Sequence, residues 1–138
     1  MKTLNLLAVT LTYLTAVLSA RGLTINARDC GAAADGAQLD TKAIQTAIDK
    51  CAAAGGGTAL LDGGKFLSGT IYLRSHVTLR VEAGATLLGS TNAGDYPHNL
   101  AAIRSYTDNY VRQSLIAGEN LENIGLVGDG LIDGQGGS

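Results

Sequence analysis

Short apolar segments separated by turns dominate the middle of this chain. Four of them lie at Thr58–Leu61, Thr70–Leu73, Val77–Val81 and Thr86–Leu88, each followed by a turn that contains Gly, Ser, His, Asp or Glu. These segments are too short for helices, and they are rich in the residues that favour strands. The pattern therefore predicts a series of short β-strands joined by tight turns.

A second stretch, at Ser114–Gly136, repeats this pattern. Placing Val77–Leu79 over Ile124–Leu126 gives an offset of 47 residues. We interpret this offset as two turns of a coil with roughly 23 residues per turn, because repeats in this range indicate a solenoid. The predicted fold is an all-β parallel β-helix, a rod whose outer strand faces can bind long polymers.

An amphipathic helix is predicted in front of these strands. Asp40 begins it as N-cap, and Gly55–Gly57 ends it, because glycine adopts the left-handed C-terminal conformation without strain. Its apolar side chains fall on one stripe, formed by Ala43, Ile44, Ala47, Ile48 and Cys51. Such a helix can cover the apolar end and the unpaired strand edges of the first coil. Before it, we expect a strand at Leu23–Asn26 and a turn at Asp35-Gly36.

The N-terminal segment has the features of a secretory signal peptide. Residues 1–20 combine a basic start at Lys2, an apolar run and small residues at Ser19-Ala20. We expect cleavage near Ala20, which leaves a domain at residues 21–138 that is secreted (extracellular or periplasmic) and has no membrane attachment. An uncleaved anchor is the alternative, but three threonines interrupt the apolar run.

The charge of the chain bears on its partners, and its cysteines bear on disulfide formation. The chain has 10 basic and 12 acidic residues, so a nucleic-acid partner has no electrostatic support. Cys30 and Cys51 form an even count in an exported chain, which favours a disulfide; two buried free thiols are the alternative.

No catalytic or metal-binding constellation is visible in the sequence. Asp129 and Asp133 are four residues apart, but both precede glycine, and Asp-Gly is a common turn pair. On one extended strand they would sit roughly 13 Å apart, beyond the separation of glycosidase carboxylates. His76 and His98 are isolated, so we predict no metal site and no cofactor. A calcium site formed between coils is left open.

Several motifs together resemble a known family. Asp29–Gly36, Asp40–Cys51 with Gly55–Thr58, Leu87–Ser90 with Asp95–Pro97, and Ile132–Gly136 are similar to family 28 glycoside hydrolases of the polygalacturonase type. The resemblance covers nearly all of residues 23–136. The helix and its glycine-rich end are shared with other pectin-lyase-like β-helices, whereas the last two motifs narrow the resemblance to family 28.

This resemblance implies a right-handed parallel β-helix that hydrolyses galacturonan or a related pectin by an inverting acid/base mechanism without a metal. The complete enzyme is expected to be a monomer. The family's catalytic motifs (Asn-x-Asp, Asp-Asp, Gly-His-Gly and Arg-x-Lys) do not occur in this chain. We therefore expect an N-terminal portion that is incomplete at its C-terminal end and inactive alone, and its catalytic residues are unknown.

The strand pattern stops between Thr91 and Gln113, which we interpret as a long loop between two turns of the coil. In a pectin-active enzyme its arginines can pair with uronate carboxylates and its tyrosines can stack on sugar rings. The candidate substrate-binding side chains are Arg104, Arg112, Tyr96, Tyr106 and Tyr110. The alternative is a packed loop with solvated arginines.

Two other functions fit the same predicted fold. One is a calcium-dependent pectate lyase or other polysaccharide lyase. The other is a β-helical carbohydrate-binding or surface module without enzymatic activity, which needs only the solenoid.

Overall fold

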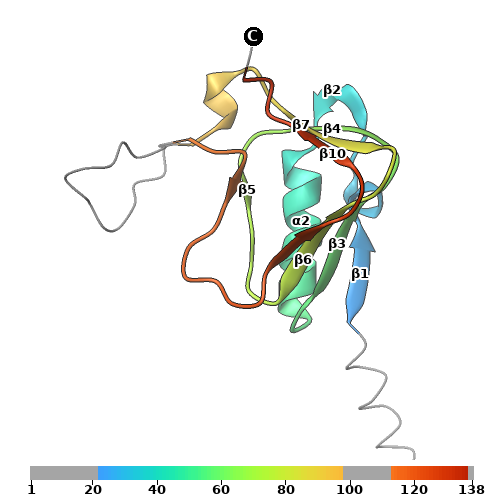
Figure 1. Ribbon diagram of the computed structural model, residues 1–138, viewed down its shortest axis with the longest axis vertical. Helices are drawn as coiled ribbons and strands as arrows, with labels where there is room; N and C mark the ends of the chain where they lie inside the picture. The colour runs from blue at the N-terminus through green and yellow to red at the C-terminus, as the bar shows by residue number, and fades with distance from the viewer. Residues whose placement is uncertain (1–21, 98–112, 137–138) are drawn as a thin grey trace, which may run out of the picture.

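The computed structural model describes residues 22–97 and 113–136 (Figure 1). Within them, strands dominate and one α-helix is present. The elements are β1 (Leu23–Asn26), η1 (Ala27–Cys30), β2 (Asp35–Leu39), α2 (Thr41–Ala53), β3 (Gly57–Leu61), β4 (Gly64–Ser68), β5 (Ile71–Tyr72), β6 (Val77–Val81), β7 (Ala85–Gly89), η2 (Ala93–Asp95), β8 (Ile116–Ala117), β9 (Gly125–Val127) and β10 (Leu131–Asp133).

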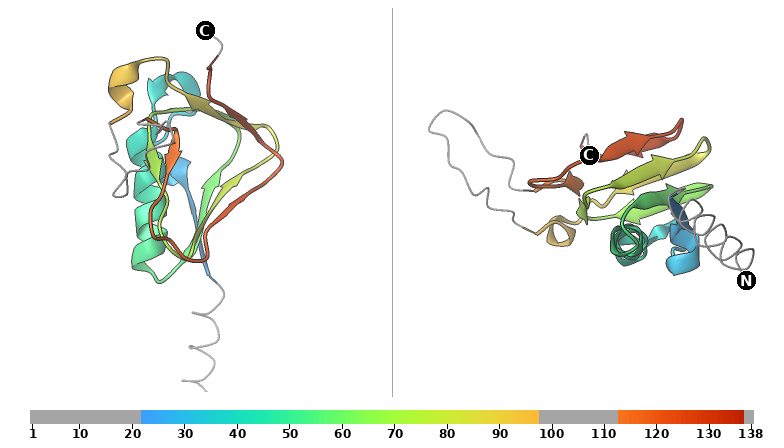
Figure 2. Two further views of the ribbon diagram at one scale, coloured as in Figure 1. Left: turned by 60° about the vertical axis from the view of Figure 1, so that its left-hand side comes forward. Right: turned by 90° about the horizontal axis from the view of Figure 1, so that it is seen from below.

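All strand pairs are parallel and belong to three sheets. Their orders are β1-β3-β6-β9, β2-β4-β7-β10 and β5-β8, so each strand lies beside the equivalent strand of the next coil. Figure 2 shows the coils stacked one on another. The prediction of an all-β fold built from parallel coils is confirmed. No helix among the described residues has the length and apolar character needed to cross a bilayer.

The strand register corrects the predicted coil length. Gly57 pairs with Val77, 20 positions later, whereas Thr78 pairs with Gly125, 47 positions later. Because β6 and β9 are direct neighbours, the 47-residue offset is one turn of the coil and not two. A segment inserted into a coil adds residues without adding a turn, so sequence spacing alone gave the wrong number.

Two strands were not predicted from the apolar pattern. The segment β4 begins with glycine and includes Lys65 and Ser68, yet it places Phe66 in the core and pairs with β7. The segment β2 lies where a turn was expected at Asp35-Gly36. Its register against β4 is irregular, and the Asp35 carboxylate accepts hydrogen bonds from the backbone N–H groups of Gln38 and Ala37, which lowers the pKa of Asp35.

The core consists of inward side chains stacked between coils. Leu79 and Leu87 are fully buried, because a coil lies on each side of them. Their partners one coil further, Leu126 and Ile132, are 48% and 40% exposed. Among the described residues, no strand pairs with the outer edge of β9 or β10. This end of the stack therefore presents apolar side chains to solvent.

The helix α2 buries the predicted stripe. Ala43, Ile44, Ala47, Ile48 and Cys51 are its buried residues, and the helix packs against β1, β3 and η1. It lies beside the first coil of the stack (Figure 2). These observations confirm the helix and its apolar face.

The ends of α2 differ in how well the sequence predicted them. Gly55 has a left-handed backbone, and the N–H groups of Gly55 and Gly56 donate to the carbonyls of Ala52 and Cys51, so the predicted glycine stop is confirmed. Asp40 precedes the helix as predicted, but its carboxylate makes no capping bond. It accepts hydrogen bonds of 2.9 Å from the N–H groups of Ala33 and Ala34 instead, which ties the helix to the preceding loop.

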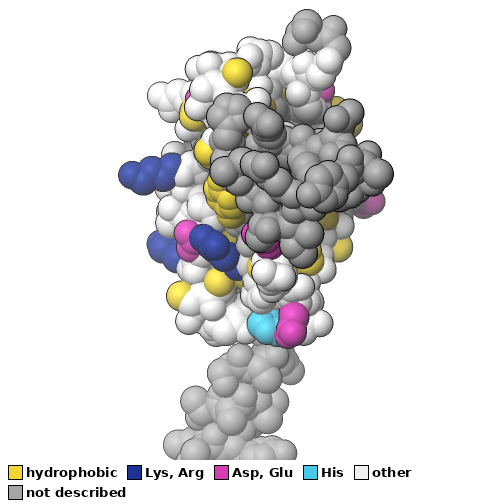
Figure 3. Space-filling model, turned by 90° about the vertical axis from the view of Figure 1, so that its left-hand side faces the viewer, with side chains coloured by type: hydrophobic (Ala, Val, Ile, Leu, Met, Phe, Trp, Pro, Cys, Tyr) yellow, Lys and Arg dark blue, Asp and Glu magenta, His cyan; other side chains and the backbone are white. Residues whose placement is uncertain are grey.

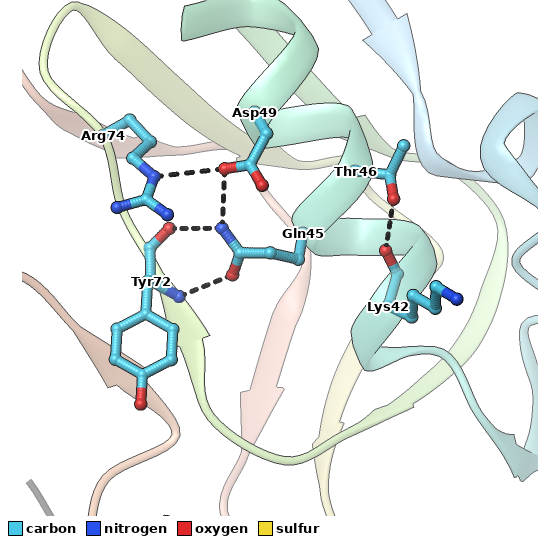
Figure 4. A network of polar contacts seen from close by, with 6 residues as sticks. All are labelled: Lys42, Gln45, Thr46, Asp49, Tyr72 and Arg74. Atoms are coloured by element: carbon cyan, nitrogen blue, oxygen red, sulfur yellow. Dashed lines mark hydrogen bonds and ion pairs between the residues drawn. The ribbon is translucent and has the colours of Figure 1, made fainter.

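The Gln45 side chain of α2 hydrogen-bonds to the edge of β5 where a neighbouring strand would otherwise pair. The strand β5 pairs with β8 on one side, and Gln45 lies on its other side. The Gln45 Oε1 atom accepts from the Tyr72 N–H at 2.8 Å, and its Nε2 atom donates to the Tyr72 carbonyl at 3.0 Å (Figure 4). Gln45 also donates to Asp49, which pairs with Arg74 at 3.1 Å. The side-chain amide thus satisfies both backbone groups that a neighbouring strand would satisfy.

Replacing Gln45 by leucine is predicted to destabilise the protein by about 1–3 kcal/mol, because the half-buried Tyr72 N–H and carbonyl lose their partners. Exchange of the Tyr72 amide hydrogen should accelerate in the same variant. Thr46→Ala is the control, since the Thr46 hydroxyl bonds only within the helix, to the Lys42 carbonyl. Unchanged Tyr72 exchange in Gln45→Leu would contradict the role given to this amide.

Candidate functional site

The candidate site lies where the chain leaves and rejoins the coil. The chain leaves after β7, which ends at Gly89, passes through η2, and returns at Gln113 shortly before β8. We call residues 89–97 together with Gln113 the stem. Residues 98–112, between the two ends of the stem, lie outside the described part of the chain.

One side of the stem is held by Ser90, which is 9% exposed. Its hydroxyl donates to Asp95 Oδ2 at 2.5 Å and accepts from the Asn92 N–H at 3.1 Å. The Tyr96 hydroxyl donates to the Ser90 carbonyl at 2.6 Å. The chain from Ser90 to Tyr96 is therefore folded back on itself as a compact turn.

The other side of the stem is held by Gln113. Its Nε2 atom donates to the Tyr96 carbonyl at 2.9 Å and to the Ala93 carbonyl at 3.3 Å. These bonds connect residues 17 and 20 positions apart. The two ends of the inserted segment are thus joined directly to each other.

Neighbouring coils also bind the stem. Gln135, which follows β10, donates to the Gly89 carbonyl at 2.6 Å. Thr70, just before β5, donates through its N–H to the Asp95 carbonyl at 3.3 Å and through its hydroxyl to the Ser114 carbonyl at 2.6 Å. The stem is therefore attached to the coil on each side of it.

Two glycines allow the stem to approach this closely. A Cβ atom at Gly69 would lie 2.0 Å from the Asp95 carbonyl oxygen. A Cβ atom at Gly89 would lie 3.0 Å from the Tyr96 hydroxyl and 3.1 Å from the Gly134 carbonyl oxygen. Any larger residue at Gly69 would push the turn away from the coil.

Burial raises the pKa of Tyr96, and the nearby Asp95 charge raises it further, although the hydrogen bond to Ser90 works in the opposite direction. The Tyr96 hydroxyl therefore stays protonated at neutral pH and remains a hydrogen-bond donor. Its role in the stem does not depend on pH in the neutral range.

The predicted substrate-binding residues are only partly described. Tyr96 is half-buried, and its hydroxyl is used inside the stem. Arg104, Tyr106, Tyr110 and Arg112 lie outside the described residues, so their roles stay predictions. Of the five candidate side chains only Tyr96 is placed by the structure, and the grouping of the five stays a prediction.

The other residues considered as catalytic or metal-binding candidates lie at turns or at the end of a strand, as far as the structure describes them. Asp129 lies between β9 and β10, and Asp133 ends β10 and accepts from the Gln135 N–H at 2.9 Å, in line with the predicted turn interpretation. The His76 ring contacts the Asn123 amide at 3.2 Å, at a corner between coils. His98 lies outside the described residues. Among those described, no three His, Cys, Asp or Glu side chains come together as a metal site.

Charges are mixed on the described part of the surface. On the described part of the face drawn in Figure 3, acidic and basic side chains lie among uncharged ones without a large patch of one sign. Arg74 pairs with Asp49, and Arg80 with Glu82 at 2.6 Å. This part of the surface therefore lacks the basic stripe typical of nucleic-acid binding.

The two cysteines are free thiols in the structure, Cys51 buried and Cys30 half-buried. Burial raises the pKa of the Cys51 thiol, and the neighbouring Cys30 raises it further. The predicted disulfide is thus not formed in this structure. Cys30 packs against the core cluster that contains Cys51, and the bridge stays a prediction for the exported, oxidised protein.

The stem is the functional feature that sequence analysis described least well. Ser90, Asp95–Pro97 and Gln135 entered only as parts of family motifs, and Gln113 entered only as the end of the predicted loop. Ser90 and Asn92 shortly before Gly94-Asp95 form a local signal, because Ser and Asn side chains bind backbone groups two residues on. No comparable local signal marks the two glutamines.

Comparison with known proteins shows which proteins the chain is similar to. The chain is 42% identical over 120 residues to an exo-poly-α-D-galacturonosidase of Dickeya chrysanthemi, which is 81% of this chain and 19% of the relative. It is 39% identical over 107 residues to a polygalacturonase of Ralstonia nicotianae, covering 73% of this chain and 20% of that one. The solved family 28 exopolygalacturonase of Yersinia enterocolitica superposes with a TM-score of 0.72 and 38% identity, over 83% of this chain and 21% of that one.

Over most of its length the chain is therefore similar to polygalacturonases of glycoside hydrolase family 28, as its motifs indicated. It spans about a fifth of the length of the curated relatives it matches. No protein-family model matches the chain.

A disulfide between Cys30 and Cys51 is predicted in the exported protein. Closing a loop of about 21 residues should stabilise the fold by about 3 kcal/mol in the chain-entropy model. Thiol titration of the unfolded, unreduced mature protein should find neither cysteine free. Detection of two reactive thiols would exclude the bridge.

Proposed function

We propose that this protein is a secreted glycoside hydrolase that cleaves galacturonan or a related pectin by inverting acid/base hydrolysis. The observation that carries the proposal is the 42% identity to an exo-poly-α-D-galacturonosidase over 81% of the chain. The stem adds support, because Ser90, Asp95 and Tyr96 belong to one of the motifs that are most specific for family 28. The proposal includes cleavage of the signal peptide at residues 1–20. It also includes a monomeric state of the complete enzyme.

The described part of the chain would serve as scaffold for this reaction. The helix α2 is proposed as the cap of a right-handed coil, since Gln45 and the buried face of the helix occupy the edge where another coil would lie. Further coils would cover the exposed Leu126 and Ile132 at the opposite end.

The catalytic acid and base are proposed to lie outside the described residues. Inverting hydrolysis needs two carboxyl groups facing one bond, about 6.5–9.5 Å apart. Several carboxylates described here are bound within the fold: Asp40 by backbone N–H groups, Asp95 by Ser90, and Asp133 by Gln135. Because the family's catalytic motifs do not occur in the chain, residues 21–138 alone are expected to release no reducing sugar from polygalacturonate.

The reaction class is tested with the complete protein and polygalacturonate. A hydrolase produces new reducing ends without an unsaturated, ultraviolet-absorbing product, and a chelator leaves its rate unchanged. A calcium-dependent lyase would produce the absorbing product and lose activity with the chelator. Polysaccharide binding without either product would show a non-enzymatic surface module, and would contradict the proposed hydrolase.

Arg104 and Arg112 are proposed to pair with substrate carboxylates. Each charge-assisted hydrogen bond contributes about 1.5–3 kcal/mol, so Arg104→Ala and Arg112→Ala should each raise KM for polygalacturonate roughly 10- to 150-fold. The control is Arg74→Ala, whose guanidinium is paired with Asp49 at α2. Unchanged KM in both variants would rule out this role for the arginines.

A further inference from the structure

The chain contains four Asp-Gly pairs, at residues 35–36, 62–63, 129–130 and 133–134. At such a pair the aspartate side chain can react with the next peptide nitrogen, because glycine has no side chain to shield that nitrogen. The reaction needs an available carboxyl group and an available glycine N–H. The four pairs differ in whether these two groups are already bound within the fold.

Two of the pairs have a bound carboxylate. The Asp35 carboxylate accepts hydrogen bonds of 2.9 Å from two backbone N–H groups of its own strand. These bonds lower the pKa of Asp35, so its reactive, protonated form is rarer. The Asp133 carboxylate accepts a bond of 2.9 Å from the Gln135 N–H. Both side chains must break a hydrogen bond before they can reach the glycine nitrogen.

The pair Asp129-Gly130 has a bound and enclosed nitrogen. The Gly130 N–H donates to the Val81 carbonyl at 2.9 Å. A Cβ atom at Gly130 would lie 2.5 Å from the Glu82 carbonyl oxygen, so neighbouring backbone surrounds this glycine. Its nitrogen is therefore not available for reaction while the coil is folded.

Asp62-Gly63, in the turn between β3 and β4, has both groups free. Asp62 is exposed, and within the described residues its carboxylate has no hydrogen-bond or ion-pair partner, nor does the Gly63 N–H have an acceptor. Around Gly63, a Cβ atom would meet only the Arg28 guanidinium, at 3.8 Å. Arg28 donates to the Asp62 carbonyl at 2.9 Å and to the Gly63 carbonyl, which leaves the two reacting groups unoccupied.

We propose that Asp62 is a site of spontaneous covalent modification, where the side chain forms a succinimide with Gly63 and then an isoaspartate. The Gly63 nitrogen attacks Cγ of the protonated Asp62 carboxyl group, the Cγ–OH bond breaks, and the OH leaves with the N–H proton as water. A water molecule then adds to the main-chain carbonyl carbon of Asp62, and the bond from this carbon to the Gly63 nitrogen breaks. The two steps release and consume one water, and no oxidant or reductant is needed.

The modification changes a contact between two coils. The new main chain passes through Cβ and Cγ of Asp62, and the former carbonyl carbon becomes a free carboxylate. The Asp62 carbonyl that accepts from Arg28 is thereby lost from the turn. Because Arg28 belongs to η1, we expect η1 to be held less firmly against the turn after modification. The reaction does not depend on the proposed function.

The test incubates the complete protein at pH 5 and 37 °C and follows each Asp-Gly pair by peptide mapping, in which fragment ions distinguish isoaspartate from aspartate. The pairs at residues 35, 129 and 133 serve as internal controls. A parallel incubation in urea measures the four pairs in the unfolded chain. The variant Asp62→Glu is the matched control, because it keeps the charge and the carbonyl but would require a six-membered ring.

Isoaspartate should form at residue 62 about 5- to 10-fold faster than at the other three pairs, since each of those must first break a hydrogen bond. In urea the four rates should become similar. Hydrogen exchange of peptides that cover residues 27–32 should accelerate in the isoaspartate fraction and stay unchanged in incubated Asp62→Glu.

Three results would overturn the proposal. One is the absence of isoaspartate at residue 62, and another is equal rates at all four pairs in the folded protein. The third is the same preference for residue 62 in urea, which would assign the reactivity to local sequence and not to the fold. Unchanged exchange of residues 27–32 in the isoaspartate fraction would contradict the loss of the Arg28 contact.

Discussion

Strands inside the stack pair their backbone N–H and carbonyl groups with the coils on both sides, and the rest of the described structure depends on this pairing. Inside the stack, the next coil supplies the partners, as in the pairing of β3 with β6. At the first coil, α2 supplies them for β5 through Gln45. The same stacking aligns inward side chains, so Leu79 and Leu87 are buried where a coil lies on each side of them.

The constraint also explains how a long segment can be inserted without disturbing the fold. Pairing depends only on the register of each strand against the neighbouring coils. A connection between two strands can therefore contain additional residues, provided that the next strand begins in register. Between β7 and β8 this is achieved by the stem, whose ends are joined by Gln113. The two ends of the insertion are thereby attached to each other and to the coils.

The sequence allowed the repeating elements to be predicted, because their signals are local. The strands at Leu23–Asn26 and Val77–Val81 and the buried stripe of α2 follow from residue type and periodicity. The strand β4 was missed because it has only two apolar residues, Phe66 and Leu67, with glycine and lysine before them and serine after them. The coil length and the stem contacts depend on pairing across 17 to 47 positions, which no local pattern specifies.

The central claim is that β6 and β9 are adjacent, with the inserted segment contained in one coil. A Cβ atom at Gly125 would lie 3.6 Å from Thr78 Cβ, within the range that a disulfide requires. In the complete protein carrying Thr78→Cys and Gly125→Cys, peptide mapping under oxidising, non-reducing conditions should find a bond between residues 78 and 125. The pair Thr58→Cys with Gly125→Cys, one coil further apart, should not bond. Absence of the first bond, with formation of the second, would contradict the account.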